Sequence, residues 1–253
     1  MTRTNRVAIV TGASRGLGRV IARVLARRGY ALVLGARNTA ALDEVAAWLD
    51  RGDSPPRVVT VSGDVADPAA RERLVAEARA LGPLRVLVNN ASELGAIEPL
   101  TDAPLVRIER VLAVNLLAPL ALTQLAMASF EVPRSAEAGL YESGLVVNIT
   151  SDAAQGAYEG WGVYGASKAA LDLASRTFAN ELHERGVSVV SVDPGDMRTR
   201  MHQAAFPGQD ISDRPLPEVT EPFWTWLFDQ PPAAVNGQRF AAQQEDTRWL
   251  SPA

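Results

Sequence analysis

Short apolar runs alternate with longer amphipathic stretches along most of this chain. The runs are rich in Val, Ile and Leu and have the length of buried strands, whereas the stretches between them repeat apolar residues with the period of a helix. The expected strands are Val7–Val10, Ala31–Leu34, Val58–Val61, Arg85–Val88, Leu145–Ile149 and Val187–Val192. The expected helices are Leu17–Arg28, Ala40–Leu49, Ala69–Leu81, Leu105–Phe130 and Tyr164–Arg185. Because a parallel sheet needs helices over both faces, this alternation predicts a doubly wound α/β fold in three layers.

The 253 residues are expected to form a single domain, since no repeat or low-complexity linker divides them. The segment from Arg200 to Pro232 differs in character, because it is rich in proline and Phe223–Phe228 holds four aromatic residues. A substrate-loop flap over about 196–230, a subunit contact or plain core would each have this composition. Packing is the preferred explanation for the aromatic residues. Gly237–Ala242 is expected to add a short strand at the sheet edge.

Composition and charge exclude several classes of protein. Apolar residues make up 47% and charged residues 21% of the chain, as in ordinary globular proteins. A net charge of −4 and a pI near 5.3 leave no basic patch for a nucleic acid or an anionic membrane surface. No apolar run approaches the roughly 18 residues that span a bilayer, and the N-terminal residues do not resemble a secretory signal. We therefore expect a cytoplasmic protein with no nucleic-acid or membrane partner.

Other chemistries are excluded by the residues that carry them. The chain lacks cysteine, so disulfides and thiolate catalysis are excluded. His183 and His202 have no partner at metal-ligand spacing, and no metal site is expected. Asp152 and Glu159 would either contact a polar substrate or be solvated loop charges, and the second interpretation is preferred.

A glycine-rich loop joins the first expected strand to the first expected helix. Gly12 permits a tight turn, Gly16 lets the backbone approach a pyrophosphate, and Gly18 lets the helix pack close to the strand. The start of the helix offers unpaired N–H groups and a positive dipole end to phosphates. This context indicates a dinucleotide-binding site in a Rossmann-type fold, with further contacts from the intervening residues Ser14, Arg15 and Leu17.

The end of the second strand indicates which nicotinamide cofactor is bound. An NAD site usually has an acidic residue there, which hydrogen-bonds the ribose 2′-hydroxyl. This strand instead ends in Arg37, and a guanidinium pairs well with a 2′-phosphate. Arg15 would supply a second cation, the alternative being that both are solvated surface arginines. NADP(H) is therefore the expected cofactor, and NAD(H) remains possible. Asp64 and Val65 follow the third strand, where the adenine should lie, and Asn90 and Ala91 end the fourth.

Tyr164 and Lys168 are spaced one helical turn apart, and Ser151 lies 13 residues before the tyrosine. On a helix this spacing brings the phenol and the ammonium to one face. A nearby cation lowers a phenol pKa that is ordinarily about 10, so that the tyrosine exchanges a proton with a substrate oxygen. Ser151 would hydrogen-bond the same oxygen. Taken alone the pair has an alternative, a packed ring beside a solvated charge.

Over about residues 5–200 the chain resembles the short-chain dehydrogenase/reductase family. The motifs that carry the resemblance occur in the family's order: Thr11-Gly-x-x-x-Gly-x-Gly18, Asp64, Asn89-Asn90-Ala91, Asn115, Ser151, Tyr164-x-x-x-Lys168 and Pro194-Gly195. The resemblance implies that Tyr164 is the general acid in reduction and the general base in oxidation. It also implies that Lys168 lowers the pKa of this tyrosine and binds the nicotinamide ribose, and that Ser151 orients the substrate oxygen.

The resemblance implies further roles. Asn115 would help hold a water that relays protons from Lys168, and Pro194, Gly195 and Thr199 would pass along the nicotinamide. Two departures from the family pattern stand out. Ser92 replaces the usual glycine after Ala91, which adds a side chain beside the cofactor, and the C-terminus lacks the common Asp-Gly-Gly ending. A homotetramer or homodimer is expected, with the long helices from Leu105 and Tyr164 as contact faces.

Together these features predict an NADP(H)-dependent oxidoreductase that transfers a hydride between the nicotinamide and a carbonyl or alcohol carbon. Its expected role is a ketone reductase, acting on a 3-oxoacyl-carrier substrate or another small ketone. One alternative is alcohol oxidation with NAD(P), and a remote one is a non-catalytic dinucleotide sensor. The substrate would be selected by Glu93–Pro99, Asp152–Gly162 and Asp196–Phe228, and fold-level analogy does not identify it.

Overall fold

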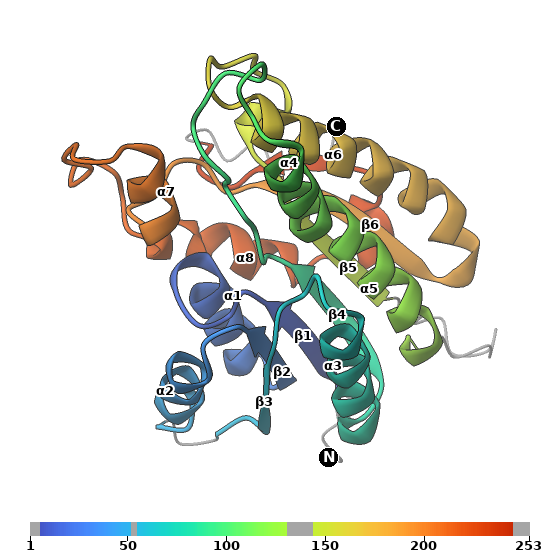
Figure 1. Ribbon diagram of the computed structural model, residues 1–253. Helices are drawn as coiled ribbons and strands as arrows, with labels where there is room; N and C mark the ends of the chain where they lie inside the picture. The colour runs from blue at the N-terminus through green and yellow to red at the C-terminus, as the bar shows by residue number, and fades with distance from the viewer. Residues whose placement is uncertain (1–5, 52–54, 131–143, 245–253) are drawn as a thin grey trace.

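Seven parallel strands form one sheet in the part of the chain that the computed structural model describes, residues 6–51, 55–130 and 144–244 (Figure 1). They are β1 (Val7–Thr11), β2 (Ala31–Ala36), β3 (Val58–Ser62), β4 (Leu84–Asn89), β5 (Gly144–Ile149), β6 (Val187–Asp193) and β7 (Arg239–Ala241). Their order is β3-β2-β1-β4-β5-β6-β7, and each neighbouring pair is parallel. The order reverses between β1 and β4, and such sheets bind ligands at the carboxyl ends of the strands beside this point. The expected doubly wound sheet is confirmed, including its short final strand.

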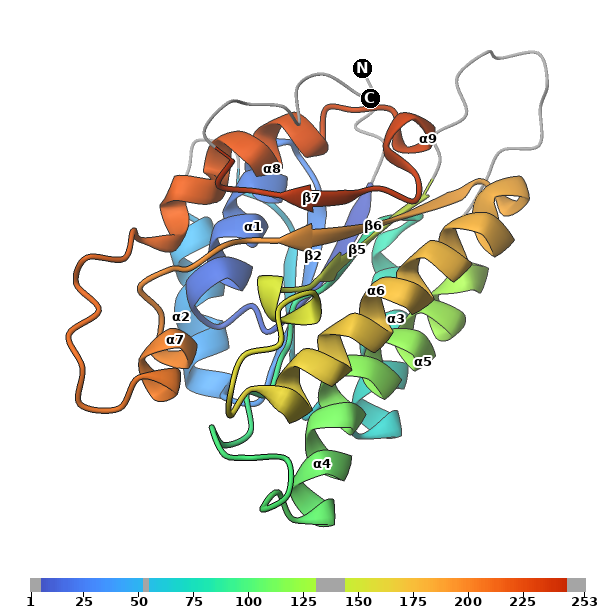
Figure 2. The same ribbon diagram turned by 90° about the horizontal axis from the view of Figure 1, so that it is seen from above.

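Helices cover both faces of this sheet, as Figure 2 shows in a view along its layers. On one face lie α1 (Gly16–Arg27), α2 (Thr39–Leu49) and α8 (Glu221–Leu227), and on the other lie α3 (Pro68–Leu81), α5 (Ala118–Ala126) and α6 (Gly162–Leu182). Successive side chains of a strand point to opposite faces. In β1, Ala8 and Val10 therefore join the first core cluster, while Val7 and Ile9 join the second. Burial on both faces explains why such strands have continuous apolar sequences.

The expected helix Leu105–Phe130 is divided into several parts. It contains α4 (Leu105–Leu112), a π-helical turn (Ala113–Leu117), α5 and a 3₁₀ turn (Met127–Ser129). Pro119 has no N–H to offer the carbonyl of Asn115 four residues earlier, so one ordinary helical hydrogen bond is missing there. Isolated π turns are frequent at functional sites, and this one carries Asn115.

The expectation that no segment could span a membrane needs a correction. By length and composition alone, Leu105–Ser129 is apolar enough to do so, and 44% of the apolar 18-residue stretch within it is buried in the protein. Polar but uncharged residues such as Asn115 and Thr123 interrupt the apolar runs, which made the stretch look shorter in the sequence. Both of these side chains are buried, and α5 packs on α3 and β4. Core packing therefore accounts for part of the apolar character of this helix, while Leu105, Val106 and Leu117 are exposed.

The segment after β6 divides into two parts. Its first part, including α7 (Arg200–Ala205), borders the cleft described below, whereas α8 belongs to the core because Phe223 and Trp224 are only 1% and 0% exposed. Arg23 of α1 donates a hydrogen bond from Nε to Glu221 of α8 at 2.6 Å. Packing thus explains these aromatic residues, whereas Asp196–His202 and Leu216–Glu218 of the expected flap border the cleft. The expectations for the two chain ends concern residues 1–5 and 245–253, which lie outside the described residues.

Candidate active site

A cleft of about 810 Å³ lies at the carboxyl ends of the strands. It is bordered by the loop after β1, by the ends of β2 to β6 and by α7. Nearly all of the site residues expected from the sequence line it: Gly12, Ser14, Arg15, Gly16, Leu17, Gly18, Arg37, Asp64, Val65, Asn90, Ala91, Ser151, Tyr164, Lys168, Pro194, Gly195 and Thr199. Asn115 is the exception, because it is fully buried behind the cleft wall.

The glycine loop has the geometry that a dinucleotide requires. Gly16 has a φ of +54°, and a Cβ placed on it would meet only the Thr199 methyl group at 3.6 Å, so its cleft side is open. A Cβ on Gly18 would lie 2.3 Å from the carbonyl oxygen of Gly12, so a side chain there would collide with the loop backbone. The first turn of α1 carries no acidic residue, which leaves its positive dipole end free for phosphates. These residues fit a bound dinucleotide.

Asn90 and Thr11 fix this loop against the neighbouring strand β4. Asn90 Nδ2 donates to the carbonyl oxygens of Thr11 at 2.8 Å and of Gly12 at 3.2 Å. Thr11 Oγ1 accepts from the backbone N–H groups of Asn90 and Ala91, each at 3.0 Å, and donates to Val88 O at 3.2 Å. The hydrogen bonds of the Asn90 side chain therefore go to the loop itself, and the sequence spacing gave no sign of this cross-link.

Two arginines and two carboxylates form a charged group at the end of the cleft beside β2 and β3. Arg37 is 66% exposed in its side chain and lies 3.4 Å from Glu93 Oε2. The same Glu93 oxygen lies 3.7 Å from Arg110, which contacts Asp64 Oδ2 at 2.6 Å. Burial opposes ionisation of Asp64, but hydrogen bonds from Arg110 and Ala66 N, together with the charges of Arg110 and Arg37, outweigh it and lower the pKa of this carboxyl. Glu93 was expected only as part of a substrate loop, and nothing in the sequence pattern indicated that it pairs with Arg37.

Asn115 makes a full set of hydrogen bonds behind the cleft wall. Its Nδ2 donates to Glu93 O at 2.8 Å and to Ser167 Oγ at 3.0 Å, while its Oδ1 accepts from Glu93 N at 2.8 Å and from Ser92 Oγ at 3.1 Å. Ser167 Oγ donates in turn to Tyr164 O at 2.6 Å. The amide orientation is fixed because Glu93 N can only donate and Glu93 O can only accept. Asn115 thus ties the loop after β4 to α6.

Tyr164 and Lys168 are both buried, and they face each other one turn apart on α6. The Lys168 Nζ lies 5.6 Å from the centroid of the tyrosine ring and donates to Ile149 O at 2.8 Å. Burial raises the pKa of Tyr164 to about 12, although side-chain hydrogen bonds with Ser92 and Ser151 oppose this. Burial lowers the pKa of Lys168 to about 8. The expected lowering of the phenol pKa is therefore wrong for the protein alone, because burial, with smaller contributions from Asp193 and Asp152, raises this pKa.

Lys168 is also the only lysine in the sequence, since the other 24 of the 25 basic residues are arginine. The position calls for a compact ammonium whose pKa responds to burial, which a guanidinium does not provide. The alternative of a packed ring beside a solvated charge does not apply, because Lys168 is only 2% exposed.

Arg239 of β7 holds the main chain of Ser151 in place by a hydrogen bond. Its Nη2 donates to Ser151 O at 2.9 Å and to Asp193 Oδ2 at 3.3 Å, and its Nε donates to Asp172 Oδ2 at 3.0 Å. Burial raises the pKa of Asp193 despite the hydrogen bond from Gly195 N and the nearby Arg239 charge. Sequence reasoning missed Arg239, because a basic residue in a short edge strand looks like an ordinary solvated position.

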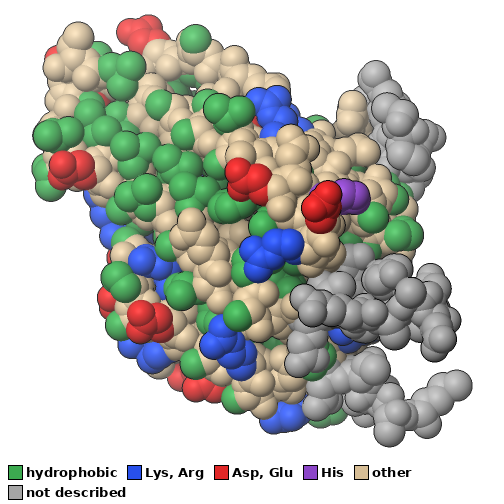
Figure 3. Space-filling model, turned by 90° about the vertical axis from the view of Figure 1, so that its right-hand side faces the viewer, with side chains coloured by type: hydrophobic (Ala, Val, Ile, Leu, Met, Phe, Trp, Pro, Cys, Tyr) green, Lys and Arg blue, Asp and Glu red, His purple; other side chains and the backbone are tan. Residues whose placement is uncertain are grey.

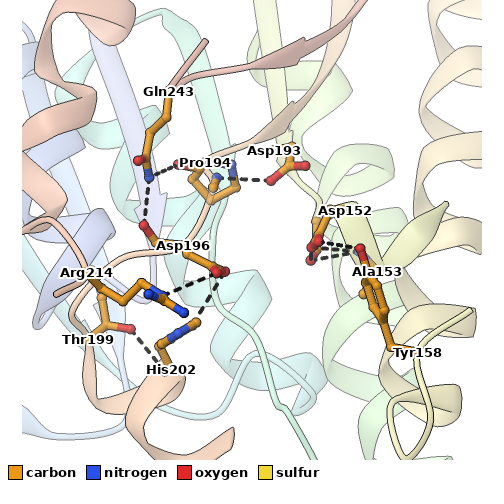
Figure 4. A network of polar contacts seen from close by, with 12 residues as sticks. Asp152, Ala153, Tyr158, Asp193, Pro194, Asp196, Thr199, His202, Arg214 and Gln243 are labelled. Atoms are coloured by element: carbon orange, nitrogen blue, oxygen red, sulfur yellow. Dashed lines mark hydrogen bonds and ion pairs between the residues drawn. The ribbon is translucent and has the colours of Figure 1, made fainter. Parts of the chain in front are cut away.

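The mouth of the cleft has polar groups on two sides (Figure 4). On one side, Asp152 accepts from Tyr158 at 2.9 Å and from Ala153 N at 2.8 Å. On the other, Asp196 lies 3.5 Å from Arg214 and 3.6 Å from His202, while Gln243 donates to main-chain oxygens of Pro194 and Asp196. The three aspartates of the mouth, Asp152, Asp193 and Asp196, thus all have partners within the chain.

The wall next to the Tyr164 ring is apolar. Trp161 meets this ring edge-on with centroids 5.9 Å apart, and Phe206 lies 6.3 Å from Trp161. Leu94 and Met201 pack in the same cluster. Among the described residues, no group of three or more His, Asp or Glu side chains gathers as a metal site.

A glycine loop for a dinucleotide and a Ser–Tyr–Lys set in one cleft define an NAD(P)-dependent oxidoreductase of the Rossmann fold. The family model for short chain dehydrogenases matches residues 6–210. An uncharacterized oxidoreductase of Methylorubrum extorquens is 34% identical over 97% of this chain and 93% of its own length. The chain therefore belongs to the short-chain dehydrogenase/reductase family.

Solved structures agree with this assignment. A short chain dehydrogenase of Pseudomonas syringae superposes with a TM-score of 0.85 at 29% identity, covering 95% of this chain and 96% of that one. Another short chain dehydrogenase, from Escherichia coli and complexed with NADPH, has a TM-score of 0.80 at 27% identity. The match covers 96% of this chain and 98% of that one.

Proposed function

We propose that this protein uses NADPH to reduce the carbonyl group of a small molecule. The observation that carries this proposal is the convergence of Ser151, Tyr164 and Lys168 in the cleft bordered by the glycine loop. When bound, the nicotinamide supplies the hydride. Ser151 and Tyr164 orient the substrate oxygen with their hydroxyl groups, and Tyr164 gives its proton to that oxygen. Because burial raises the pKa of Tyr164 to about 12, the phenol is held protonated and ready to donate.

The charge pattern at the end of β2 supports NADP(H) over NAD(H). No carboxylate ends this strand, and the exposed guanidinium of Arg37 borders the cleft. Arg15, at the entry to α1, borders it as well. A 2′-phosphate would compete with Glu93 for Arg37 and would form a shorter, doubly charged pair. The NADPH complex of the Escherichia coli relative is consistent with this preference.

The substrate that fits best is a neutral ketone or aldehyde with an apolar portion. The apolar portion would lie against Trp161, Leu94 and Met201, beside the phenol of Tyr164. At the mouth, Asp193 and Asp196 lie beside basic side chains, whereas the carboxylate of Asp152 has only neutral partners and disfavours an anionic substrate group. Burying such an apolar group against this wall contributes about 25 cal/mol of binding free energy per Å² of apolar surface removed from water.

The test is a panel of carbonyl compounds incubated with the protein and NADPH, followed by the loss of nicotinamide absorbance. Neutral aryl and alkyl ketones should turn over faster than 2-oxo acids and sugars. Running the corresponding alcohols with NADP⁺ distinguishes reduction from oxidation as the favoured direction. If NADPH binds but no member of a broad panel reacts, the protein is a dinucleotide sensor and the proposal fails.

We also propose that the protein forms a homodimer or homotetramer. Large apolar side chains are exposed on the outer faces of α4 and α6: Leu105 is 68% and Val106 72% exposed, and Leu173 is 59% exposed. Figure 3 shows hydrophobic side chains gathered on one part of this side of the molecule, and such patches mark association surfaces. Light scattering should give a multiple of the monomer mass, and Leu173→Glu should reduce it. A monomeric wild-type protein at micromolar concentration contradicts this.

A further inference from the structure

Asp152 lines the cleft directly after Ser151 and is held there by three neutral donors (Figure 4). Its Oδ1 accepts from Ser151 Oγ at 2.9 Å and from Ala153 N at 2.8 Å, and its Oδ2 accepts from the Tyr158 hydroxyl at 2.9 Å. A Cβ on Gly156 would lie 2.5 Å from the Tyr158 ring, so this glycine leaves room for the ring beside Asp152. The carboxylate is therefore fixed next to the serine hydroxyl.

The hydroxyl proton of Ser151 points to Asp152 in this structure. A carboxylate has no proton to give, so the serine is the donor in that contact. Ala153 N lies 3.2 Å from Ser151 Oγ and donates to it. The hydroxyl can therefore offer only an acceptor to a molecule in the cleft. A ketone oxygen can also only accept, so Ser151 must turn its O–H away from Asp152 to bind such an oxygen.

This rotation takes one donor away from Asp152 Oδ1, which then keeps only the bond from Ala153 N. Hydrogen bonds to an ionised group are stronger than neutral ones, so a substrate that offers only its carbonyl oxygen loses a favourable contact. A ketone with a hydroxyl group on the neighbouring carbon can give its own O–H to Asp152 in exchange. The carboxylate then keeps three donors while Ser151 donates to the carbonyl oxygen.

We propose that Asp152 is a specificity-determining residue that selects ketones with a hydroxyl group on the carbon next to the carbonyl. This rests on the proposed function, in which Ser151 binds the oxygen of the carbonyl that is reduced. The other substituent of the ketone lies against the apolar wall of Trp161 and Leu94. Glu159, a described residue of the same loop, is exposed and lies outside the cleft lining, so it provides a comparison.

The test compares α-hydroxyacetophenone with propiophenone, which has nearly the same shape and a methyl group in place of the hydroxyl. With NADPH, the ratio of their kcat/KM values should fall about 10-fold in Asp152→Ala, as expected for one hydrogen bond to an exposed charged group. Comparing this ratio between proteins cancels the intrinsic reactivity of the ketones. Glu159→Ala should keep the wild-type ratio. The ratio of α-methoxyacetophenone, which has no O–H, to propiophenone should be the same in all three proteins.

A second readout does not depend on turnover. Protein loaded with NADP⁺ cannot reduce either ketone, and ligand NMR titration then gives the dissociation constant of each. The preference for α-hydroxyacetophenone over propiophenone should fall about 10-fold in Asp152→Ala. An unchanged preference, an equal fall in Glu159→Ala, or no binding of the hydroxy ketone to the wild type overturns the role of Asp152. If the wild type reduces no ketone but the binding preference still falls in Asp152→Ala, the proposed function fails and the hydroxyl-binding role of Asp152 stands.

Discussion

Arg239 and Ser151, 88 residues apart in sequence, are joined by a 2.9 Å hydrogen bond from the guanidinium Nη2 to the main-chain oxygen. The same guanidinium binds Asp172, one turn after Lys168 on α6, and Asp193 at the end of β6. One side chain from the edge strand thus holds together the two segments that carry Ser151 and Lys168. The segment that carries Ser151 is thus held by a residue that does not line the cleft.

We predict that Arg239→Met lowers both stability and turnover. Removing the cation leaves two largely buried carboxylates without their partner, so the free energy of unfolding should fall by about 2–3 kcal/mol. Because Ser151 is less firmly held, kcat should fall more than NADPH affinity. The measurements are chemical denaturation, steady-state kinetics and fluorescence titration. Arg27→Met is the control, since its exposed contact with Glu221 at 3.7 Å should contribute less than about 0.5 kcal/mol. Equal effects of the two substitutions would refute the prediction.

Tyr164→Phe should reduce kcat at least about 1,000-fold, since it removes the proton donor from the oxygen of the reacting carbonyl. The ring remains to pack against Trp161, so folding and NADPH binding should be retained. Long-incubation or stopped-flow kinetics measure the fall in kcat, and fluorescence titration measures NADPH binding. Substantial residual kcat would show that another group donates the proton.

Lys168→Met should abolish turnover while making the protein no less stable at pH 7. Burial lowers the pKa of Lys168 to about 8 from 10.5, so below pH 8 the native state carries the full penalty of a buried charge. That penalty is about 3 kcal/mol, partly offset by the hydrogen bond to Ile149 O. As pH rises from 8 toward 10.5, the native state loses its proton before the unfolded state does, and wild-type stability rises.

The stability advantage of Lys168→Met should therefore be largest near pH 7 and shrink toward pH 10. Denaturation curves of both proteins at these two pH values measure it. The comparison stops at pH 10 because the pKa of Tyr164 is raised in the folded protein. Above pH 10 the unfolded states of both proteins lose the phenol proton before the folded states do, so the stability of both falls. An advantage that grows with pH would contradict the expected pKa of Lys168.

Arg37→Ala should weaken NADPH binding about 10-fold or more and leave NADH binding nearly unchanged, because only NADPH has a 2′-phosphate for the guanidinium. Glu93→Gln should strengthen NADPH binding modestly, since it removes the carboxylate that lies 3.4 Å from Arg37. Dissociation constants for NADPH and NADH, measured by fluorescence titration, test the expected effects of both substitutions. Arg176→Ala, an exposed arginine on α6, is the matched control. Equal losses for the two cofactors would rule out 2′-phosphate recognition by Arg37.

The strands and most helices could be predicted because their residues are buried on both faces or along one stripe. Val7–Thr11 is an example, since each of its side chains is buried and its first four residues are all apolar. The π turn at Asn115 could not be predicted from periodicity, because its five residues are too few to change the apolar pattern of the longer helix. The membrane-length character of Leu105–Ser129 was missed for a related reason, since its buried polar residues are uncharged.

The site could be predicted where its residues lie close together in the sequence, as Tyr164 and Lys168 do on one helix. It could not be predicted where the contact joins distant segments. Glu93 with Arg37 and Arg239 with Ser151 arise only when strands from different parts of the chain end at one edge of the sheet. The direction of the Tyr164 pKa was also wrong, because sequence spacing gives the neighbouring charge and not the depth of burial.

A single lysine in the whole sequence makes Lys168 its only side-chain amine, and that amine is enclosed. Isotope-labelled lysine would give one side-chain signal, which reports directly from the proton-transfer centre without any substitution. Amine-directed reagents and acyl-transfer enzymes would find no lysine on the surface of the folded protein. Modification of Lys168 by them, as distinct from the N-terminal amine, would therefore measure how often the active site opens.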